Sequence, residues 1–230
     1  MRFAALAAVA LCAASAAQAG IKEARFSAPT TRYDHGVLGD AIEFGTLVLT
    51  TDAGRSVTLK LPETRVFEDI APRLVDVDLD GDNEVVVIET SIAKGARLSI
   101  YDESGLIAAT PYIGQTHRWL APVGAADFDG DGYIELAYID RPHLARTLRI
   151  WRFKDGALEH VLDQAGLTNH RIGDALISGG VRRCGTPEMI NMNSDWSKIM
   201  SSTFENGRIT TQEIGPYKGY SSSQEALLCN

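Results

Sequence analysis

The sequence predicts an all-β protein built from a repeated unit, and two observations lead to this prediction. Short apolar runs alternate with turns containing Gly, Asp and Ser, and no long stretch has the 3.6-residue period of a helix. A nine-residue acidic segment also occurs twice, as DVDLDGDNE from Asp76 to Glu84 and as DFDGDGYIE from Asp127 to Glu135. A repeat of about 50 residues containing several short strands indicates small sheets that pack against one another.

The expected strands follow the apolar runs, which are bounded by turn residues. Between the second and third runs, the segment from Thr51 to Gly54 has the composition of a hairpin turn. The strands are expected at residues 23–27, 46–50, 56–61, 73–77, 84–89, 96–101, 106–110, 124–128, 134–139, 147–153, 158–162 and 188–193.

The repeat extends beyond the acidic segments, because Ala-Pro precedes each copy and an apolar strand follows each. A third, altered copy keeps Gly185 and Glu188 but has Gly180, Arg182 and Cys184 where the second copy has aspartates. Four strands per unit predict a small β-propeller of about four blades, near residues 34–66, 67–116, 117–169 and 170–220. The strand at 23–27 is expected to complete the last blade. Five blades, or an open array that exposes two sheet edges, are the alternatives.

The first 19 residues have the features of a secretory signal peptide. One arginine precedes a short apolar run that ends in Ala17-Gln18-Ala19, so cleavage is expected before Gly20 and residues 20–230 form one domain. No later stretch is long enough to span a membrane. The protein is therefore expected to be exported, periplasmic or secreted, with Cys184 and Cys229 forming a disulfide; two buried thiols that never meet are the alternative.

The formal net charge of −8 comes from 22 basic and 30 acidic residues, and nine of the acids lie in the two acidic segments. Outside them the balance is 22 − 21 = +1, so the acidity is local. Local acidity favours bound cations over a uniformly acidic surface. The absence of a lysine- or arginine-rich stripe argues against nucleic-acid binding.

The two acidic segments predict calcium sites. Carboxylates stand at positions 1, 3, 5 and 9 and a glycine at position 6, an oxygen-only ligand set on a sharp turn that suits Ca²⁺. An EF-hand is the rival interpretation, but its loop needs a glutamate at position 12 and a following helix. Acidic turns without an ion are the other alternative. The candidate ligands are Asp76, Asp78, Asp80 and Glu84, and Asp127, Asp129, Asp131 and Glu135.

The pattern D-x-D-x-D-G-x-x-E before an apolar strand resembles the FG-GAP/VCBS repeats of integrin-α-like propellers. The resemblance covers residues 67–200 well. It implies a propeller with about two Ca²⁺ ions, one in each hairpin loop between the first and second strands of a blade. It also implies that the backbone carbonyls at position 7, those of Asp82 and Tyr133, complete the ligand sets.

In the resembled propellers, ligands tend to bind on the face opposite the ions. Here the matching connections carry His35, His117 and His170, together with Trp119. These residues are the candidate ligand face, as a binding pocket or a transition-metal site; histidines that only anchor turns are the alternative. No role is assigned to His143 or His160.

No motif of a known catalytic class is present: the chain has no GxSxG, HExxH, P-loop or CxxC. The favoured function is a non-catalytic exported propeller, stabilised by calcium, that binds a protein or a glycan. The alternative is a hydrolase or lyase whose site lies on the histidine-bearing face.

Overall fold

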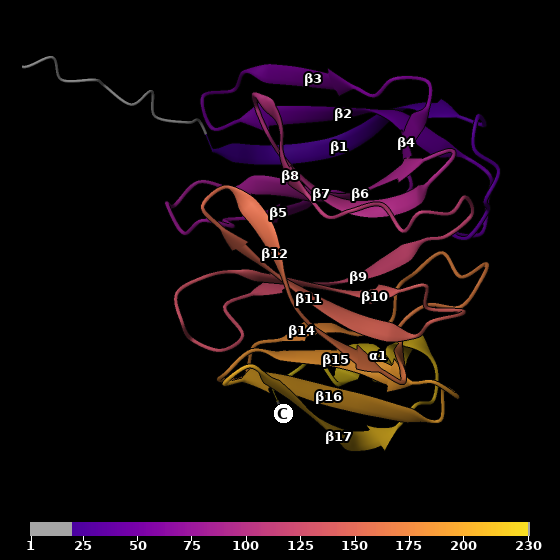
Figure 1. The fold of residues 1–230 in the computed structure, drawn as a ribbon, viewed down its shortest axis with the longest axis vertical. Helices are drawn as coiled ribbons and strands as arrows, with labels where there is room; N and C mark the ends of the chain where they lie inside the picture. The colour runs from indigo at the N-terminus through magenta and orange to yellow at the C-terminus, as the bar shows by residue number, and fades with distance from the viewer. Residues whose placement is uncertain (1–19, 230) are drawn as a thin grey trace, which may run out of the picture.

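The structure is a computed structural model and describes residues 20–229, so the predicted signal peptide lies outside the described residues. Strands in three antiparallel sheets make up most of this part of the chain (Figure 1). One short helix, α1 (Tyr220–Glu225), follows the last strand. The predicted all-β class is therefore confirmed.

The first sheet has eight strands and joins two groups. The first group contains β1 (Ile21–Thr30), β2 (Glu43–Thr51) and β3 (Ser56–Lys60). The short β4 (Arg65–Phe67) pairs with both β2 and β6 and so connects the groups. The second group is an antiparallel meander of β5 (Arg73–Val75), β6 (Glu84–Ser91), β7 (Gly95–Asp102) and β8 (Gly105–Ala109).

The second and third sheets repeat the meander. The second sheet contains β9 (Leu120–Ala126), β10 (Glu135–Asp140), β11 (Thr147–Lys154) and β12 (Ala157–Ala165). The third contains β13 (Leu167–Thr168), β14 (Gly180–Arg182), β15 (Glu188–Asn193), β16 (Lys198–Glu205) and β17 (Arg208–Pro216). Every strand expected from the sequence is present, and β4, β13, β14, β16 and β17 are additional.

The prediction that the strand at 23–27 completes the last blade is wrong. This segment is part of β1, which pairs antiparallel with β2 along its length, from Ile21 opposite Thr51 to Thr30 opposite Glu43. Only residues 31–42 separate β1 from β2, so this antiparallel pairing closes a much smaller loop than pairing with the far end of the chain.

The hydrophobic core lies between successive groups of strands. On β6, Val85 and Val87 face the β1–β3 group, whereas Val86 and Ile88 face the β9–β12 sheet. On β10, Leu136 and Tyr138 face β6, whereas Ala137 and Ile139 face the third sheet. Successive side chains of a strand point to opposite faces, so these central strands are buried on both sides. Each meander is thus held by apolar contact with its neighbours.

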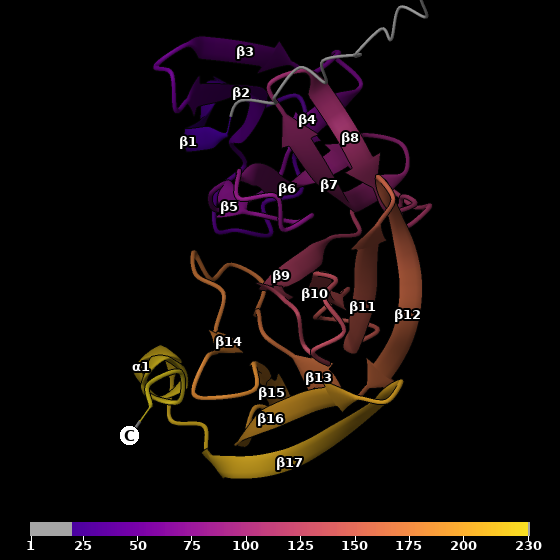
Figure 2. The same ribbon diagram turned by 90° about the vertical axis from the view of Figure 1, so that its left-hand side faces the viewer.

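The sheets follow one another along an arc (Figure 2). Within residues 20–229, no strand of the third sheet pairs with the first sheet, and no sheet is closed. Two connections nevertheless meet between the first and last groups, because the amide of Gly173 donates to the carbonyl of Val37 at 3.0 Å. The blade boundaries and the propeller arrangement stay predictions.

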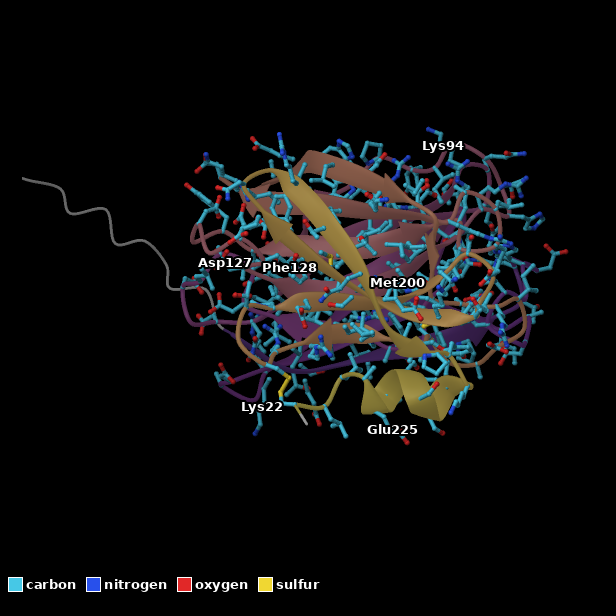
Figure 3. The ribbon with its side chains drawn as sticks, turned by 90° about the horizontal axis from the view of Figure 1, so that it is seen from below. Lys22, Lys94, Asp127, Phe128, Met200 and Glu225 are labelled. Atoms are coloured by element: carbon cyan, nitrogen blue, oxygen red, sulfur yellow. A yellow bond between two sulfur atoms is a disulfide. The ribbon has the colours of Figure 1, made fainter. Side chains whose placement is uncertain are left out.

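The C-terminal segment is fixed by a disulfide between Cys184 and Cys229, whose Cα atoms are 5.4 Å apart. It ties the end of the chain, after α1, to the loop between β14 and β15 (Figure 3). The expected pairing of these two cysteines is therefore present. No helix within residues 20–229 is long and apolar enough to cross a membrane.

Candidate functional site

The two acidic loops lie side by side at one end of the molecule. One connects β5 to β6 and the other connects β9 to β10, and both project to the same side in Figure 1. Asp78 of the first loop and Tyr133 of the second line one shared cavity of about 320 Å³. The repeat thus places both predicted cation sites on the same end.

The two loops share the main features of their internal geometry. The glycine amide at position 6 donates to the first aspartate in each: Gly81 to Asp76 at 3.1 Å, and Gly132 to Asp127 at 3.0 Å. Both glycines have positive φ, at 100° and 87°, which allows the sharp turn. The glutamate at position 9 begins the next strand and accepts a hydrogen bond from the amide at position 2 in each loop, at 2.9 Å. These features of the turn are therefore the same in both copies of the repeat.

Carboxylates at positions 1, 3 and 9 converge in both loops. One oxygen from each lies within 4.8 Å of the others, in the groups Asp76, Asp78, Glu84 and Asp127, Asp129, Glu135. The position-5 carboxylates stand outside these groups, and Asp80 and Asp131 instead accept hydrogen bonds from the amides of Asp82 and Tyr133. Three of the four predicted side-chain ligands thus meet in each loop.

The donor set fits a hard divalent cation. Asp76 Oδ1 and Asp129 Oδ1 are buried oxygen atoms without a hydrogen-bond partner among the described residues. In the first loop, burial raises the pKa of Glu84 to about 7, and the charges of Asp78, Asp80 and Asp76 add to the rise. Orphaned oxygens and crowded carboxylates are what a cation in the loop would satisfy.

Arg152 on β11 makes the second loop different from the first. Its guanidinium contacts Asp129 at 2.8 Å, Asp131 at 2.7 Å and Glu135 at 2.6 Å. In the first copy, Tyr101 of β7 pairs with Val85, so the position facing Glu84 is Asp102, an acid. The second loop thus carries its own counter-charge, and the first has no equivalent arginine.

The third copy has an arginine where the second copy has an aspartate. Arg182 occupies a former aspartate position, and its Nε donates to Glu188, the retained glutamate, at 2.6 Å. The disulfide at Cys184 lies two residues further along the same loop. In this copy a guanidinium therefore contacts the glutamate, and the disulfide links the loop to the C-terminal segment.

The candidate ligand face lies at the opposite end of the strands. His117 and Trp119 precede β9, whose other end leads into the second acidic loop. Figure 3 shows Asp127 of that loop and Lys94 of the β6–β7 turn on opposite sides of the molecule. A cavity of about 380 Å³ opens at the Lys94 end. It is lined by His35, His117, Arg118, Trp119, Arg141, His143, Leu144 and Ile172.

Of the four residues predicted for the ligand face, His35, His117 and Trp119 line this cavity, and His170 lies behind it. His170 is 1 % exposed and stacks edge-on against Trp119, with ring centroids 4.9 Å apart. Trp119 is itself only 2 % exposed, and its indole N–H donates to the carbonyl of Glu68 at 2.8 Å. Trp119 therefore forms an anchored wall of the cavity.

Two hydrogen-bonded pairs fix the histidines. His170 Nε2 lies 2.8 Å from the carbonyl of Asp174, which only accepts, so this nitrogen carries the proton. His170 Nδ1 can then accept from His143 Nε2 at 3.1 Å. Burial, followed by the neighbouring His170 and His35, lowers the pKa of His143 to about 4, so this ring is neutral near pH 7.

The second pair joins His35 to a buried carboxylate. His35 Nδ1 lies 2.6 Å from Glu68 Oε1, and Thr90 donates to the other oxygen of Glu68 at 2.6 Å. Glu68 is completely buried, and burial raises its pKa while the bond to His35 opposes this rise. The pair holds the imidazole of His35 with Nδ1 toward Glu68.

The sequence did not predict several members of this end, which include His143, Glu68 and Glu43 as well as the cavity-lining Arg141, Leu144 and Ile172. His143 follows the end of β10, and this end of β10 pairs with the start of β9, close to His117. The predicted order of strands could therefore have placed His143 at this end. Glu68 and Glu43 gave no signal, because their burial depends on how the β1–β3 group packs. His160 lies elsewhere, where its Nε2 contacts Asp163 at 2.8 Å.

Residues 76–138 match the FG-GAP-like repeat family. The matched segment runs from the start of the first acidic loop to within β10 and contains both loops. The resemblance expected from the sequence is confirmed for these residues. A comparison of the chain with curated proteins gives no match.

Proposed function

Starting from the FG-GAP-like repeat at residues 76–138, we propose that this protein is an exported, non-catalytic binding module. Its strands form a small propeller of about four blades, calcium occupies the two acidic loops, and a partner docks at the histidine end. The observation that carries the proposal is that the two ends of the molecule carry different kinds of site. Two matching carboxylate loops occupy one end, and an open cavity occupies the other.

Three features support the propeller arrangement. The strands β5–β8, β9–β12 and β14–β17 form successive antiparallel meanders with apolar cores between them. The Gly173–Val37 hydrogen bond brings the connections of the first and last groups together. A Cβ on Gly39 would lie 2.9 Å from the carbonyl of Gly173, so the two connections are in close contact.

Export is supported by the disulfide and by the sequence of residues 1–19. A disulfide that closes 45 residues is typical of oxidising compartments. We propose a periplasmic or secreted location.

Calcium is expected to raise the melting temperature of the mature chain. With affinities typical of extracellular modules, 1 mM Ca²⁺ contributes about 1 kcal/mol per site. The double variant Asp76→Asn, Asp78→Asn should lose about half of the stabilisation, because one loop remains. Differential scanning fluorimetry with CaCl₂ or EGTA measures this effect, and Glu205→Gln, which removes an exposed carboxylate on β16 outside both loops, is the control. A melting temperature that neither reagent shifts would refute calcium binding.

Arg152→Ala is expected to make the second loop depend more strongly on calcium than it does in the parent. Without the guanidinium, Asp129, Asp131 and the buried Glu135 lose their counter-charge, and in EGTA the stability should fall by about 3 kcal/mol. Millimolar Ca²⁺ should restore part of the loss. Arg182→Ala removes the analogous pair with Glu188 from a loop without aspartates, so calcium should not rescue it. Urea denaturation of both variants, with and without CaCl₂, distinguishes the two outcomes.

An enzyme is the second candidate, and one contact favours it. The bond between His35 and the buried Glu68 resembles the orientation of a general base, with the other ring nitrogen left available. A hydrolase or lyase at this end would lose its activity in His35→Gln and Glu68→Gln. A screen of glycan and protein binding alongside hydrolase and lyase substrates separates the two classes.

A further inference from the structure

The cavity at the histidine end is built to receive an anion. Its lining contains three histidines and two arginines but no carboxylate. Arg141 is already paired with Asp140, because its Nε and Nη2 donate to the two carboxylate oxygens of Asp140, each at 2.9 Å. Arg118 donates one N–H to the carbonyl of His117 at 2.9 Å and forms no ion pair with a carboxylate of residues 20–229. Arg118 is therefore the cation available to a ligand.

The acidic groups near the cavity do not compete for Arg118. Glu68 lies behind His35 and is fully buried there. Asp34 contacts His117 at 3.0 Å from the outside and is 83 % exposed. Asp174 presents its backbone carbonyl to His170. With Arg118 free of a carboxylate partner among residues 20–229 and no carboxylate in the lining, an anion is favoured over a metal cation.

Apolar side chains flank the same cavity. Leu144 is 63 % exposed and Ile172 is 72 % exposed, and Trp119 closes the wall beneath. Two large aliphatic side chains held in water beside a cavity are a common mark of a contact surface. A ligand that fits must carry an apolar group close to its negative charge.

The backbone of the cavity wall is held in an unusual conformation. His117 has φ of 52° and Arg141 has φ of 45°, both in the left-handed region that non-glycine residues seldom adopt. The carbonyl of Arg118 accepts from the amide of Ala96 at 2.9 Å, and the hydroxyl of Tyr33 accepts from the amide of His117 at 2.8 Å. Strain of this kind is often retained where it positions a binding group.

We propose that the cavity binds the C-terminal residue of a partner polypeptide, with its free carboxylate on Arg118 and an apolar side chain against Leu144, Ile172 and Trp119. This inference rests on the proposed binding function and names its partner. A C-terminal apolar residue carries the carboxylate and the apolar group on one carbon atom, unlike an internal aspartate or glutamate. A cavity of about 380 Å³ is at the small end of ligand sites, enough for a terminal residue rather than a long segment.

Fluorescence anisotropy with pentapeptides labelled at the N-terminus tests the proposal. The peptides share a glycine–serine leader and end in leucine, isoleucine, valine or phenylalanine, each as the free acid and as the C-terminal amide. At least one free acid should bind roughly 10- to 100-fold more tightly than its amide, the effect of losing a charge-assisted pair. Equal binding of acid and amide, or no binding by any of the four acids, would overturn the proposal.

Variants of the cavity locate the binding. Arg118→Gln should lose at least tenfold in affinity, and Arg118→Lys should retain part of it. Lys94→Gln changes the same charge at the same end, outside the cavity, and should bind as the parent does. The indole N–H signal of Trp119 in a ¹⁵N spectrum should shift on titration with the free acid and stay fixed with the amide, and near-UV circular dichroism confirms the fold of each variant.

Two further outcomes identify a different occupant. If 4-methylpentanoate binds and the leucine peptide does not, the cavity takes a small organic acid and the peptide proposal fails. If Zn²⁺ binds in competition with the free acid and Arg118→Gln leaves peptide affinity unchanged, the histidines form a metal site and the proposal also fails. Either result leaves a non-catalytic binding module in place, whereas turnover of screened substrates would refute the proposed function itself.

Discussion

Gly95→Ala is expected to destabilise the protein by about 3 kcal/mol or more and to disrupt the histidine end. Gly95 starts β7 with φ of 73°, and a Cβ there would overlap the carbonyl of Gln115 and lie 2.7 Å from that of Arg118. Backbone cannot move aside as a side chain can. The segment that carries His117, Arg118 and Trp119 would have to shift, so binding at the cavity should be lost as well.

Gly54→Ala provides the matched control for this prediction. Gly54 has φ of 77°, almost the same as Gly95, but nothing lies within 4 Å of its added Cβ. Gly54→Ala should lower the free energy of unfolding by about 1 kcal/mol, from backbone strain alone. Urea denaturation of both variants measures the difference. Equal losses would show that conformational strain, rather than contact with the 115–118 segment, sets the requirement for glycine at Gly95.

The strands could be predicted because their burial follows from local pattern. The segment EVVVIE contains an uninterrupted β-branched run at Val85–Ile88, and the structure buries both of its faces between two neighbouring groups. The acidic loops could be predicted for the same reason, since the spacing of their carboxylates and glycine fixes the turn. These features depend on residues close together in the chain.

The partners of each strand could not be predicted in the same way. β1 has the alternation of a strand, but alternation does not specify whether it pairs with β2 or with the last sheet. In the sequence, Arg152 is one charged residue of a predicted strand. It contacts the second loop only because the register of β11 places it opposite Glu135. Arg182 appeared as a lost ligand, yet in the structure it contacts Glu188. These are long-range contacts.

The two ends of the molecule also differ in how they balance charge. The acidic loops gather exposed and buried carboxylates close together, and Arg152 provides a counter-charge in the second loop only. The histidine end instead buries its carboxylates, with Glu68 bonded to His35 and Asp69 bonded to Arg73 at 2.7 Å. Glu43 is the third buried acid of this group and is 2 % exposed. The carboxyl of Glu43 is therefore the group whose burial should be most costly.

Glu43→Gln is expected to stabilise the protein at neutral and alkaline pH. Burial raises the pKa of Glu43 to about 9, and the neighbouring charges of Glu68, Asp40 and Asp69 raise it further in the same direction. In the unfolded chain this carboxyl has a pKa of about 4.3 and is ionised above that pH, but in the folded protein it stays protonated until about pH 9. Its contribution to stability is thus fully present below about pH 4 and is lost as the pH rises through 9.

A neutral glutamine removes this dependence. The gain in stability over the parent should be near zero at pH 4.5, reach at most about 4 kcal/mol at pH 7, and grow until about pH 9. Urea denaturation at pH 4.5, 7 and 9 measures it, and Glu63→Gln, whose side chain is 78 % exposed, should show no such trend. A Glu43→Gln variant that is less stable at pH 9 would mean that the carboxylate is ionised and paired in the folded protein. The histidine end would then hold a negative charge beside Glu68, which would weaken the case for an anionic partner there.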